Sequence, residues 1–315
     1  MLGFCRGVAC SATLAKRRTV QDRPIPAIAM RLAATLLLSA MFALAKLVQA
    51  RGVGLVEALF FRQSIMLLPV LALAAAGPGL ASLKTARPWA HAKRSAAGLT
   101  GMSLNFATVA LLPLAETQTL WFTVPLIMTI FGALWLGERV GPHRWGAVAV
   151  GFLGVLIVFQ PGTTSVAPLG LAMGLSSAVM MSMTAILVRQ LGATEGSLTT
   201  VFWFGLLSSA ALLVPMLFVV GPHDSTTWVL LLALGIVGGL GQVAMTFSLR
   251  FAPVSVLAPV DYAALIWAAG FGYLLFDAVP TPWTWVGAPV IVVSGLYIVW
   301  RERRLAKAAS IGVID

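Results

Sequence analysis

FAPVSVLAPVDYAALIWAAGFGYLLFD, residues 251–277, is an apolar stretch long enough to cross a lipid bilayer as a helix. It carries one acid in its interior, Asp261, and a proline two positions earlier, Pro259. A carboxylate is costly at that depth and usually faces a bundle interior or a water-filled cavity. The proline leaves the carbonyl of Ser255 without its helical partner. These features predict an opened helix beside a charge, as in a solute cavity, or alternatively a kink kept for packing.

The composition of the whole chain is that of an integral membrane protein. Of its 315 residues, 59% are hydrophobic and 10% are charged, against roughly 25% charged in soluble domains. The formal net charge of +11 comes from basic residues spread over the short gaps between apolar runs. This distribution argues against nucleic acid as a partner and for a role in membrane topology. The two cysteines, Cys5 and Cys10, show neither metal-ligand spacing nor a disulfide framework.

Apolar segments follow one another from Met30 onward. The sequence predicts ten spans, at about 30–49, 55–76, 96–113, 116–137, 144–160, 168–188, 197–220, 227–249, 253–276 and 283–300. Residues 1–29 lack the apolar core and cleavage site of a secretory signal, so we expect a disordered cytoplasmic tail there, with Met30 as an alternative start of translation. Residues 301–315 are expected to form a basic cytoplasmic tail.

The basic residues are distributed unequally between the two sides of the membrane. With the N-terminal tail in the cytoplasm, 18 of the 21 Lys and Arg residues, Arg31 among them, fall on the cytoplasmic side. Arg51 falls in an outer loop, and Lys46 and Arg62 fall within spans. This asymmetry predicts a multi-pass protein of the cell inner (plasma) membrane with both termini cytoplasmic.

Two parts of the chain share one plan, 115–159 and 252–300. In each part a long helix that contains a proline ends at an acid, and a short turn and a span with several glycines follow. The acids are Glu138 and Asp277. We read Glu138 and Asp277 as helix-end anchors or as members of salt bridges.

The shared plan divides the chain into two halves, 30–160 and 168–300, of five spans each. An odd number of spans reverses the orientation of the second copy relative to the first. The predicted fold class is therefore all-α, with ten transmembrane helices as two inverted five-helix repeats. Glycines at helical spacing are expected to let these helices pack closely: Gly151 with Gly154, Gly170 with Gly174, and Gly235 with Gly239.

Specific motifs within residues 112–162 and 240–303 carry a resemblance to a known family. Pro125 followed by Gly137-Glu138, and Lys46 followed by the run Phe60-Phe61-Arg62, resemble the EamA branch of the drug/metabolite transporter superfamily. The resemblance covers nearly everything after Met30. Asp277 departs from it, since the second copy of the repeat more often has Glu there.

The resemblance implies ten spans and metabolite transport by alternating access. Carriers of this branch move amino acids, S-adenosylmethionine, riboflavin or opine-type metal chelators. We expect a secondary active transporter, monomeric or homodimeric and without a cofactor, that moves a small polar metabolite of cofactor-like or amino-acid-like type. Proton coupling and exchange both remain open. The alternative is an efflux carrier for amino acids, opine-type chelators or drugs.

The substrate site is expected where the fourth and ninth spans meet. Their proline-disrupted stretches should approach one another across the pseudo-twofold axis, with free carbonyls at Trp121 and Ser255. The expected wall mixes aromatic faces, amides and one charge, which suits a planar polar metabolite: Asn105, Trp121, Gln242, Asp261, Tyr262 and Trp267. Helix packing is the alternative role for the amides and the aromatic residues.

Further charges on the first two spans are candidates for a charged pocket or for coupling, together with Asp261: Lys46, Glu57 and Arg62. Two cations and an acid suit a zwitterion or a carboxylate. Glu57 and Arg62 point about 140° apart on an ideal helix, so each needs another partner. Lys46 has the alternative of extending its ammonium to the membrane surface.

Other classes of protein fit the sequence less well. An enzyme needs a nucleophile with a base, paired acids or a histidine cluster. His91, His143 and His223 are expected in loops on two sides of the membrane. Neither catalysis nor a metal site is therefore expected. The sequence has no phosphate-binding loop of the GxxxxGK type. A channel would require a ring of repeated polar groups, whereas the polar residues of the two halves differ.

Overall fold

The computed structural model describes residues 24–135, 137, 140–160, 168–192, 194–248, 251–252 and 254–311. The secondary structure of these residues is helical. Its elements are α1 (Pro24–Ala50), α2 (Leu55–Ala76), the 3-10 helix η1 (Leu80–Leu83), α3 (Pro88–Leu111), α4 (Leu114–Trp121), α5 (Val124–Leu134), α6 (Pro142–Phe159), α7 (Pro168–Gly192), α8 (Ser197–Val219), α9 (Ser225–Ser248), α10 (Val254–Asp261), α11 (Ala263–Phe276) and α12 (Pro282–Ile311).

Within the described ranges, nine helical stretches are long and apolar enough to cross a membrane. Two of them consist of two helices in line, α4 with α5 and α10 with α11, and together these form the fourth and ninth spans. The remaining expected span is α3, which has 24 residues but carries His91, Lys93 and Arg94 in its first turns. The predicted ten-helix fold is confirmed, and α3 is its least apolar member.

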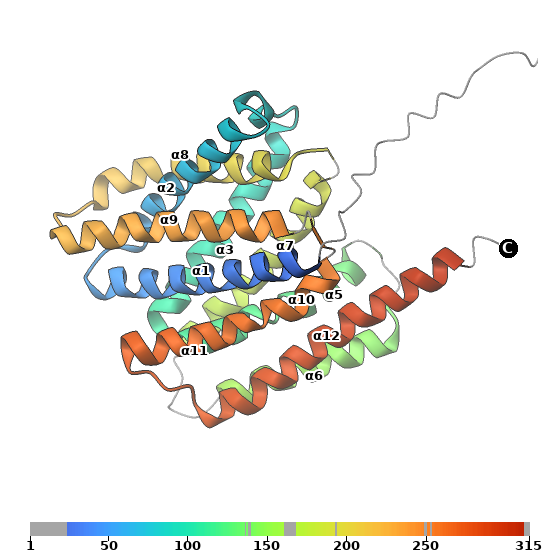
Figure 1. Cartoon of the computed structure of the whole chain (residues 1–315). Coiled ribbons are helices and arrows are strands. Elements are labelled where there is room, and N and C mark those ends of the chain that lie inside the picture. Colours follow the sequence, from blue (N-terminus) through green and yellow to red (C-terminus); the bar gives the residue numbers. More distant parts are fainter. Residues whose placement is uncertain are drawn as a thin grey trace, which may run out of the picture.

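Both ends of the bundle are more helical than expected. α1 begins at Pro24, so residues 24–29 are not part of a disordered tail, while residues 1–23 lie outside the described part. Proline is well suited to the first turn of a helix, where its missing N–H has no partner to lose. α12 continues to Ile311 through a stretch rich in Arg, Ala and Leu, which favour helix. Figure 1 shows the start of α1 and the end of α12 at the same end of the bundle.

The contacts between helices are the same when each span is replaced by its counterpart in the other half of the chain. α1 packs on α9 and α3 packs on α7, so the first span meets the eighth and the third meets the sixth. The counterpart of each span lies five spans away in the chain, so the first span corresponds to the sixth and the eighth to the third. The first of these pairs therefore corresponds to the second. The pairs α2 with α8 and α6 with α12 are each converted into themselves. This pattern is the one that two repeated halves produce.

The breaks in the fourth and ninth spans differ in their position relative to proline. In the fourth span the chain leaves helical order at Phe122 and Thr123, and Pro125 then occupies the first turn of α5. In the ninth span Pro259 lies inside α10, and the break comes at Tyr262. The opening expected at Pro259 is therefore displaced toward the C-terminus, beyond Asp261.

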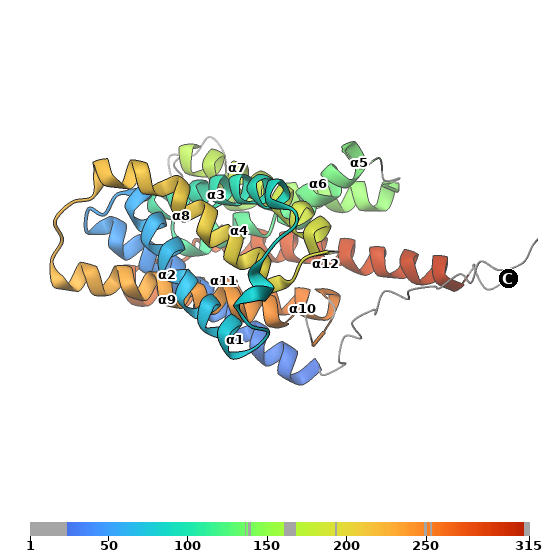
Figure 2. The same cartoon turned by 90° about the horizontal axis from the view of Figure 1, so that it is seen from above.

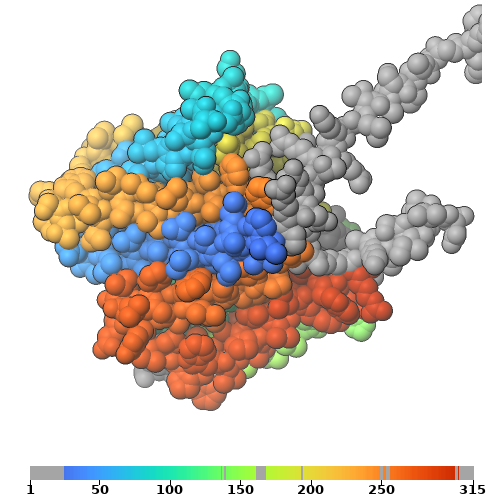
Figure 3. Space-filling model, viewed as in Figure 1, coloured from blue at the N-terminus to red at the C-terminus, as the bar shows by residue number. Residues whose placement is uncertain are grey.

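Glycines allow several helices to approach closely, as predicted. A Cβ atom added to Gly154 of α6 would lie 2.9 Å from the carbonyl oxygen of Gly287 in α12. One added to Gly239 of α9 would lie 2.9 Å from Pro69 of α2. α6 and α12 lie together along the lower side of the bundle (Figure 1), and α3 and α7 lie side by side when the molecule is seen from above (Figure 2). α9, α1 and α11 form successive bands on one face (Figure 3).

Candidate functional site

A cavity of about 350 Å³ lies between α1, α4, α5, α10 and α11, which is within the usual range for small-molecule sites. Its wall is mostly apolar and aromatic, with few polar groups. The lining residues are Arg31, Thr35, Leu38, Ser39, Phe42, Gln118, Trp121, Phe122, Val124, Pro125, Met128, Ala185, Met245, Ala258, Asp261, Tyr262, Ala264 and Val299. We call this space the central cavity.

One end of the central cavity carries an ion pair between α1 and α10. The guanidinium of Arg31 binds the Asp261 carboxylate through two parallel contacts, Nε to Oδ1 at 2.5 Å and Nη2 to Oδ2 at 2.7 Å. Nη1 of Arg31 also donates to the carbonyl of Met245 at 3.2 Å. The Arg31 side chain is 6% exposed and that of Asp261 is 32% exposed, so the acid faces the cavity more than its partner does. The planar fork of arginine suits such a bidentate contact.

This pair changes the expectation for both residues. Arg31 was expected among the cytoplasmic basic residues, but the side chain is buried within the bundle. Asp261 is therefore not an isolated charge. Arg31 lies on one stripe of α1 with Thr35, Leu38 and Phe42, at the spacing of one helix face, and all four line the cavity. That stripe is the signal in the sequence that identifies the cavity face of α1.

The two helix breaks meet at the central cavity. The rings of Phe122 and Tyr262 are in edge-to-face contact, with centroids 4.8 Å apart and planes at 72°. Trp121 lies beside Phe42 of α1, with ring centroids 6.3 Å apart. Trp121 and Tyr262 thus present aromatic surface to the cavity from the fourth and ninth spans.

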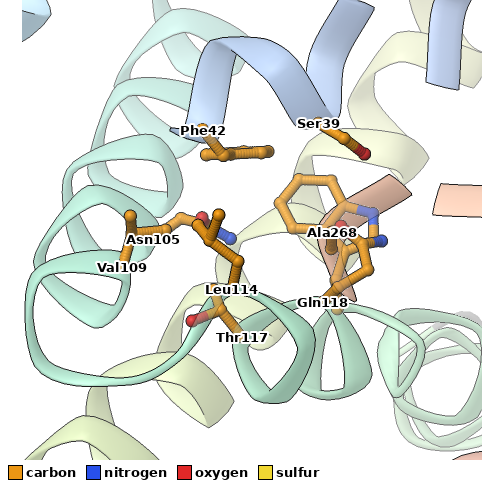
Figure 4. A pocket seen from close by; sticks show the side chains of 9 residues that line it. Ser39, Phe42, Asn105, Val109, Leu114, Thr117, Gln118 and Ala268 are labelled. Atoms are coloured by element: carbon orange, nitrogen blue, oxygen red, sulfur yellow. The ribbon is translucent and has the colours of Figure 1, made fainter. Parts of the chain in front are cut away.

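A narrow recess of about 10 Å³, roughly the space for one water molecule, adjoins the central cavity. It shares Ser39, Phe42, Gln118 and Trp121 with that cavity and is closed by Asn105 and other residues of α3, α4 and α11. Figure 4 shows Ser39 and Phe42 of α1 on one side of the recess and Thr117 and Gln118 of α4 on the other. The Oδ1 atom of Asn105 is buried and has no hydrogen-bond partner among the described residues. Asn105 therefore offers an acceptor beside the recess.

The six residues expected at the site have different positions. Trp121, Asp261 and Tyr262 line the central cavity, and Asn105 lines the recess. Trp267 stands behind the wall, where its Nε1 donates to Oγ1 of the cavity residue Thr35 at 3.3 Å. Gln242 of α9 is not among the residues that line either space. Sequence reasoning missed Gln118, Thr35 and Ser39, whose polar atoms border the cavity.

The other charged candidates lie apart from the cavity and from one another. Nζ of Lys46 donates to the carbonyl oxygens of Leu112 at 2.6 Å and Val109 at 3.0 Å, at the C-terminal end of α3. Glu57 is buried and contacts Nε2 of His223 at 2.7 Å. His223 is thus the separate partner that the sequence required for Glu57. They also mean that Lys46 and Glu57 do not form one pocket with Arg62.

Two of the three histidines differ from the expectation in their position, whereas the helix-end acid Asp277 does not. His91 and His143 lie in the first turns of α3 and α6 rather than in loops, and only His223 is in a connecting segment. The described residues contain no group of three or more His, Cys, Asp or Glu side chains placed to hold a metal ion. Asp277 follows the last residue of α11 as expected, and Glu138 lies outside the described residues.

Comparison with known proteins identifies the same pattern twice in the chain. The family described as the EamA-like transporter family matches residues 25–160 and again residues 168–301. A known crystal structure superposes with a TM-score of 0.60 at 23% identity, covering 87% of this chain and 96% of the other, and so shares the fold.

Relatives with assigned functions align over most of their own length. A riboflavin transporter of Rhizobium johnstonii is 28% identical over 72% of this chain and 75% of its own. The pseudopaline exporter CntI of Pseudomonas aeruginosa is 32% identical over 64% and 71%, respectively. An S-adenosylmethionine uptake transporter of Rickettsia prowazekii is 27% identical over 78% and 82%. The three relatives are named for three different solutes.

Proposed function

Because the chain belongs to the EamA-like transporter family, we propose that it moves a small polar metabolite across the cell inner membrane by alternating access. The observation that carries this proposal is the central cavity, which the two halves line jointly with the Arg31–Asp261 pair and the aromatic residues of both helix breaks. The halves 30–160 and 168–300 exchange roles, so that the cavity opens first to one side and then to the other. The solute leaves chemically unchanged.

The substrate class follows from the wall of the central cavity. Trp121 and Tyr262 provide faces for a planar group, and Gln118 and Asn105 provide amides for hydrogen bonding. Asp261 is partly exposed and can bind a cationic group of the solute. A cofactor-like or amino-acid-like metabolite combines these features, which agrees with relatives named for riboflavin and S-adenosylmethionine.

Asp261 is the proposed coupling residue. Its carboxylate holds Arg31 in the present arrangement, and either a proton or a cationic group of the solute would weaken that pair. The pair lies at the end of the cavity where α1 begins, which the distribution of basic residues places in the cytoplasm. Release of the pair would open this side of the cavity. Without a proton, transport would be coupled by exchange, in which two solutes bind at Asp261 in turn.

Efflux of an amino acid, an opine-type chelator or a drug is the second candidate function. The specific observation in its favour is the 32% identity to a pseudopaline exporter. The neighbouring cation and carboxylate of Arg31 and Asp261 also suit a molecule that carries both charges.

Transport by purified protein in liposomes distinguishes these functions. A thermal-shift screen with riboflavin, S-adenosylmethionine, amino acids and opine-type chelators first selects ligands, and uptake is then measured with the labelled compound. We expect saturable uptake and counterflow by a protein that acts as a monomer or homodimer in the bilayer. Flux that rises linearly with concentration and shows no counterflow would indicate a channel and would contradict the proposal.

A further inference from the structure

A groove of about 640 Å³ lies on the surface of the bundle, apart from the central cavity. It runs between α3 and α7, which are side by side (Figure 2), and Trp135, directly after the end of α5, adds a third wall. None of the described residues that line it also lines the central cavity. We call this space the lateral groove.

Each of the two helices lines the lateral groove with one stripe of its surface, at the spacing of a helix face. The stripe on α3 is polar at its two ends and small in between: Lys93, Ala96, Ala97 and Thr100. The stripe on α7 is long and apolar up to a terminal amide: Met180, Met183, Leu187 and Gln190. Alanines opposite longer side chains leave the space between the two helices unfilled.

The lateral groove has the length of one leaflet of a bilayer. A Cβ atom added to Gly101, next to Thr100, would lie 3.1 Å from Cβ of Met180, so this is the deep end of the groove. Lys93 and Gln190 lie at the opposite end. The ten residues from Met180 to Gln190 rise by about 15 Å, which is half of the hydrocarbon thickness of roughly 30 Å.

The end of the lateral groove at Lys93 is positively charged. Across the described side chains no ion pair joins an acid to Lys93, which is exposed. It differs in this from Arg62, which is buried and whose Nη1 donates to the side-chain oxygen of Gln63. Arg189 of α7 is exposed at the same end. None of the described residues that line the groove is acidic, so its charge suits an anionic ligand.

Trp135 indicates the depth of the charged end. The fourth span ends on the side of the membrane where α3 begins, and Trp135 is 63% exposed there. Tryptophan is enriched where the headgroups of a bilayer meet its hydrocarbon. Lys93 and Gln190 are therefore expected at headgroup level, with the methionines of α7 deeper in the hydrocarbon.

We propose that the lateral groove is a binding site for one anionic phospholipid of the leaflet that the distribution of basic residues predicts to be cytoplasmic. The headgroup phosphate pairs with Lys93 and accepts a hydrogen bond from the Gln190 amide. One acyl chain lies along Met180, Met183 and Leu187, since methionine adapts its shape to a flexible apolar partner. A zwitterionic lipid would bring an ammonium group to the positively charged end and binds less well.

The bound lipid would connect the two halves of the chain. α3 and α5 belong to the first half and α7 to the second, and all three contact the lateral groove. Ala185 of α7, between the groove residues Met183 and Ile186, lines the central cavity. The lipid therefore stabilises a helix that also forms the cavity wall.

Thermal unfolding of the delipidated full chain in detergent tests the site, with circular dichroism as the signal. Phosphatidylglycerol is added in the same detergent, and phosphatidylcholine with the same acyl chains is the comparison. Since a ligand that binds only the folded state stabilises it, we expect the Tm to rise with phosphatidylglycerol and to level off, and to rise less with phosphatidylcholine. Lys93→Gln is expected to raise the apparent Kd for phosphatidylglycerol about fivefold. Lys84→Gln, at an exposed lysine outside the groove, is the matched control and should respond like the wild type.

A second variant tests the apolar part of the lateral groove. Ala96→Phe places a ring in the groove and should abolish the response to phosphatidylglycerol, whereas Ala211→Phe, at an exposed alanine of α8, should retain it. Glycerol phosphate has the anionic group without acyl chains and should leave the Tm unchanged. Native mass spectrometry counts the bound lipid without reference to unfolding and should show one phosphatidylglycerol on the wild type and on Lys84→Gln.

Two sets of results would overturn the lipid site. Equal responses to the two phospholipids, or wild-type responses in both Lys93→Gln and Ala96→Phe, would mean that lipid binds the whole apolar surface without preference. A Tm rise with glycerol phosphate would mean that the charged end binds free phosphate. Neither result bears on the transport proposal, because both variants leave the lining of the central cavity unchanged.

Discussion

Arg31 and Asp261 connect the first span to the ninth by two parallel contacts, of 2.5 and 2.7 Å, across 230 positions of sequence. The pair closes the end of the central cavity nearest to the start of α1. It also places the acid of an interrupted helix against a cation that has little other solvation, since Arg31 is 5% exposed. Removal of either charge should therefore alter both stability and transport.

Asp261→Asn keeps the size of the side chain and removes its charge. Because Arg31 then stays buried without a carboxylate, we expect the free energy of unfolding to fall by roughly 1–3 kcal/mol. We also expect transport to be lost, or its pH dependence to be abolished. Uptake into proteoliposomes across a series of external pH values, with thermal unfolding of the same samples, measures both effects.

Asp277→Asn is the matched control for Asp261→Asn, because Asp277 is an exposed acid at the end of the same span. It should leave both quantities unchanged. Wild-type transport with an unaltered pH profile in Asp261→Asn would remove Asp261 from the coupling mechanism.

Trp121→Ala and Tyr262→Ala remove aromatic surface from opposite halves of the cavity. Each is expected to weaken substrate binding by about 1 kcal/mol or more, which is the scale of a lost aromatic contact. Trp145→Ala is the control, since Trp145 is 41% exposed and does not line the cavity. Binding titrations with the ligand selected by thermal shift measure the change. Unchanged affinity in both cavity variants would place the substrate elsewhere.

Gly295→Ala tests the position of Tyr262 without touching the substrate directly. The new Cβ atom would lie 2.7 Å from the Tyr262 hydroxyl oxygen, so the ring has to move. We expect weaker substrate binding. The double variant Gly295→Ala with Tyr262→Phe lacks the clashing oxygen. It should bind the substrate almost as tightly as Tyr262→Phe alone. Failure of the recovery would show that the effect does not pass through this contact.

Gly154→Ala tests the seam between α6 and α12. Its Cβ atom would meet backbone, 2.9 Å from the Gly287 carbonyl oxygen, and backbone cannot move aside as a flexible side chain can. We expect a loss of about 1–3 kcal/mol of stability, as for overpacking in a core. Gly146→Ala in the same helix meets open space and should be neutral or stabilising. A Tm for Gly154→Ala equal to that of Gly146→Ala would contradict the seam.

Single cysteines test the orientation of the bundle. In a background with Cys5 and Cys10 replaced by serine, Arg51→Cys introduces a thiol between α1 and α2, and Lys84→Cys introduces one between η1 and α3; both positions are exposed. We expect a membrane-impermeant maleimide to label Arg51→Cys on intact cells and to label Lys84→Cys only after lysis. The reverse labelling would invert the proposed topology.

The helices were more predictable from sequence than the contacts of the site. Apolar length predicts spans, and Pro125 and Pro259 indicated which spans are interrupted, because these are local properties of the chain. The position of the second break, at Tyr262, depends on tertiary packing and was not predicted. Asp261 is identifiable from the sequence because it is the lone acid of its span. Arg31 lies near the start of a span, where the sequence favours a basic residue on the cytoplasmic side of the membrane over a partner for Asp261.

The fate of the other charges shows why residue pairs escaped prediction. Glu57 and His223 are separated by 166 positions, and no periodicity in one helix indicates which loop will cover it. Gln242 has the polarity expected of a cavity residue, but the face of α9 that meets the cavity includes Met245 instead. Which face of a helix points into a membrane bundle depends on how the helix packs against its neighbours. Because lipid is as apolar as the interior of the bundle, the sequence shows no strong difference between buried and lipid-facing positions.

The seam of α6 and α12 bears on how such a chain arises. α6 and α12 are the counterparts of one another in the two halves. In an ancestor built from two identical five-span chains, this helix would therefore have packed against its own copy. Gly154 and Gly287 now stand at that meeting point, each where a Cβ atom would strike the other's carbonyl oxygen. In the ancestor a single substitution would have altered both sides of the seam at once. In the single chain each side of the seam can vary alone.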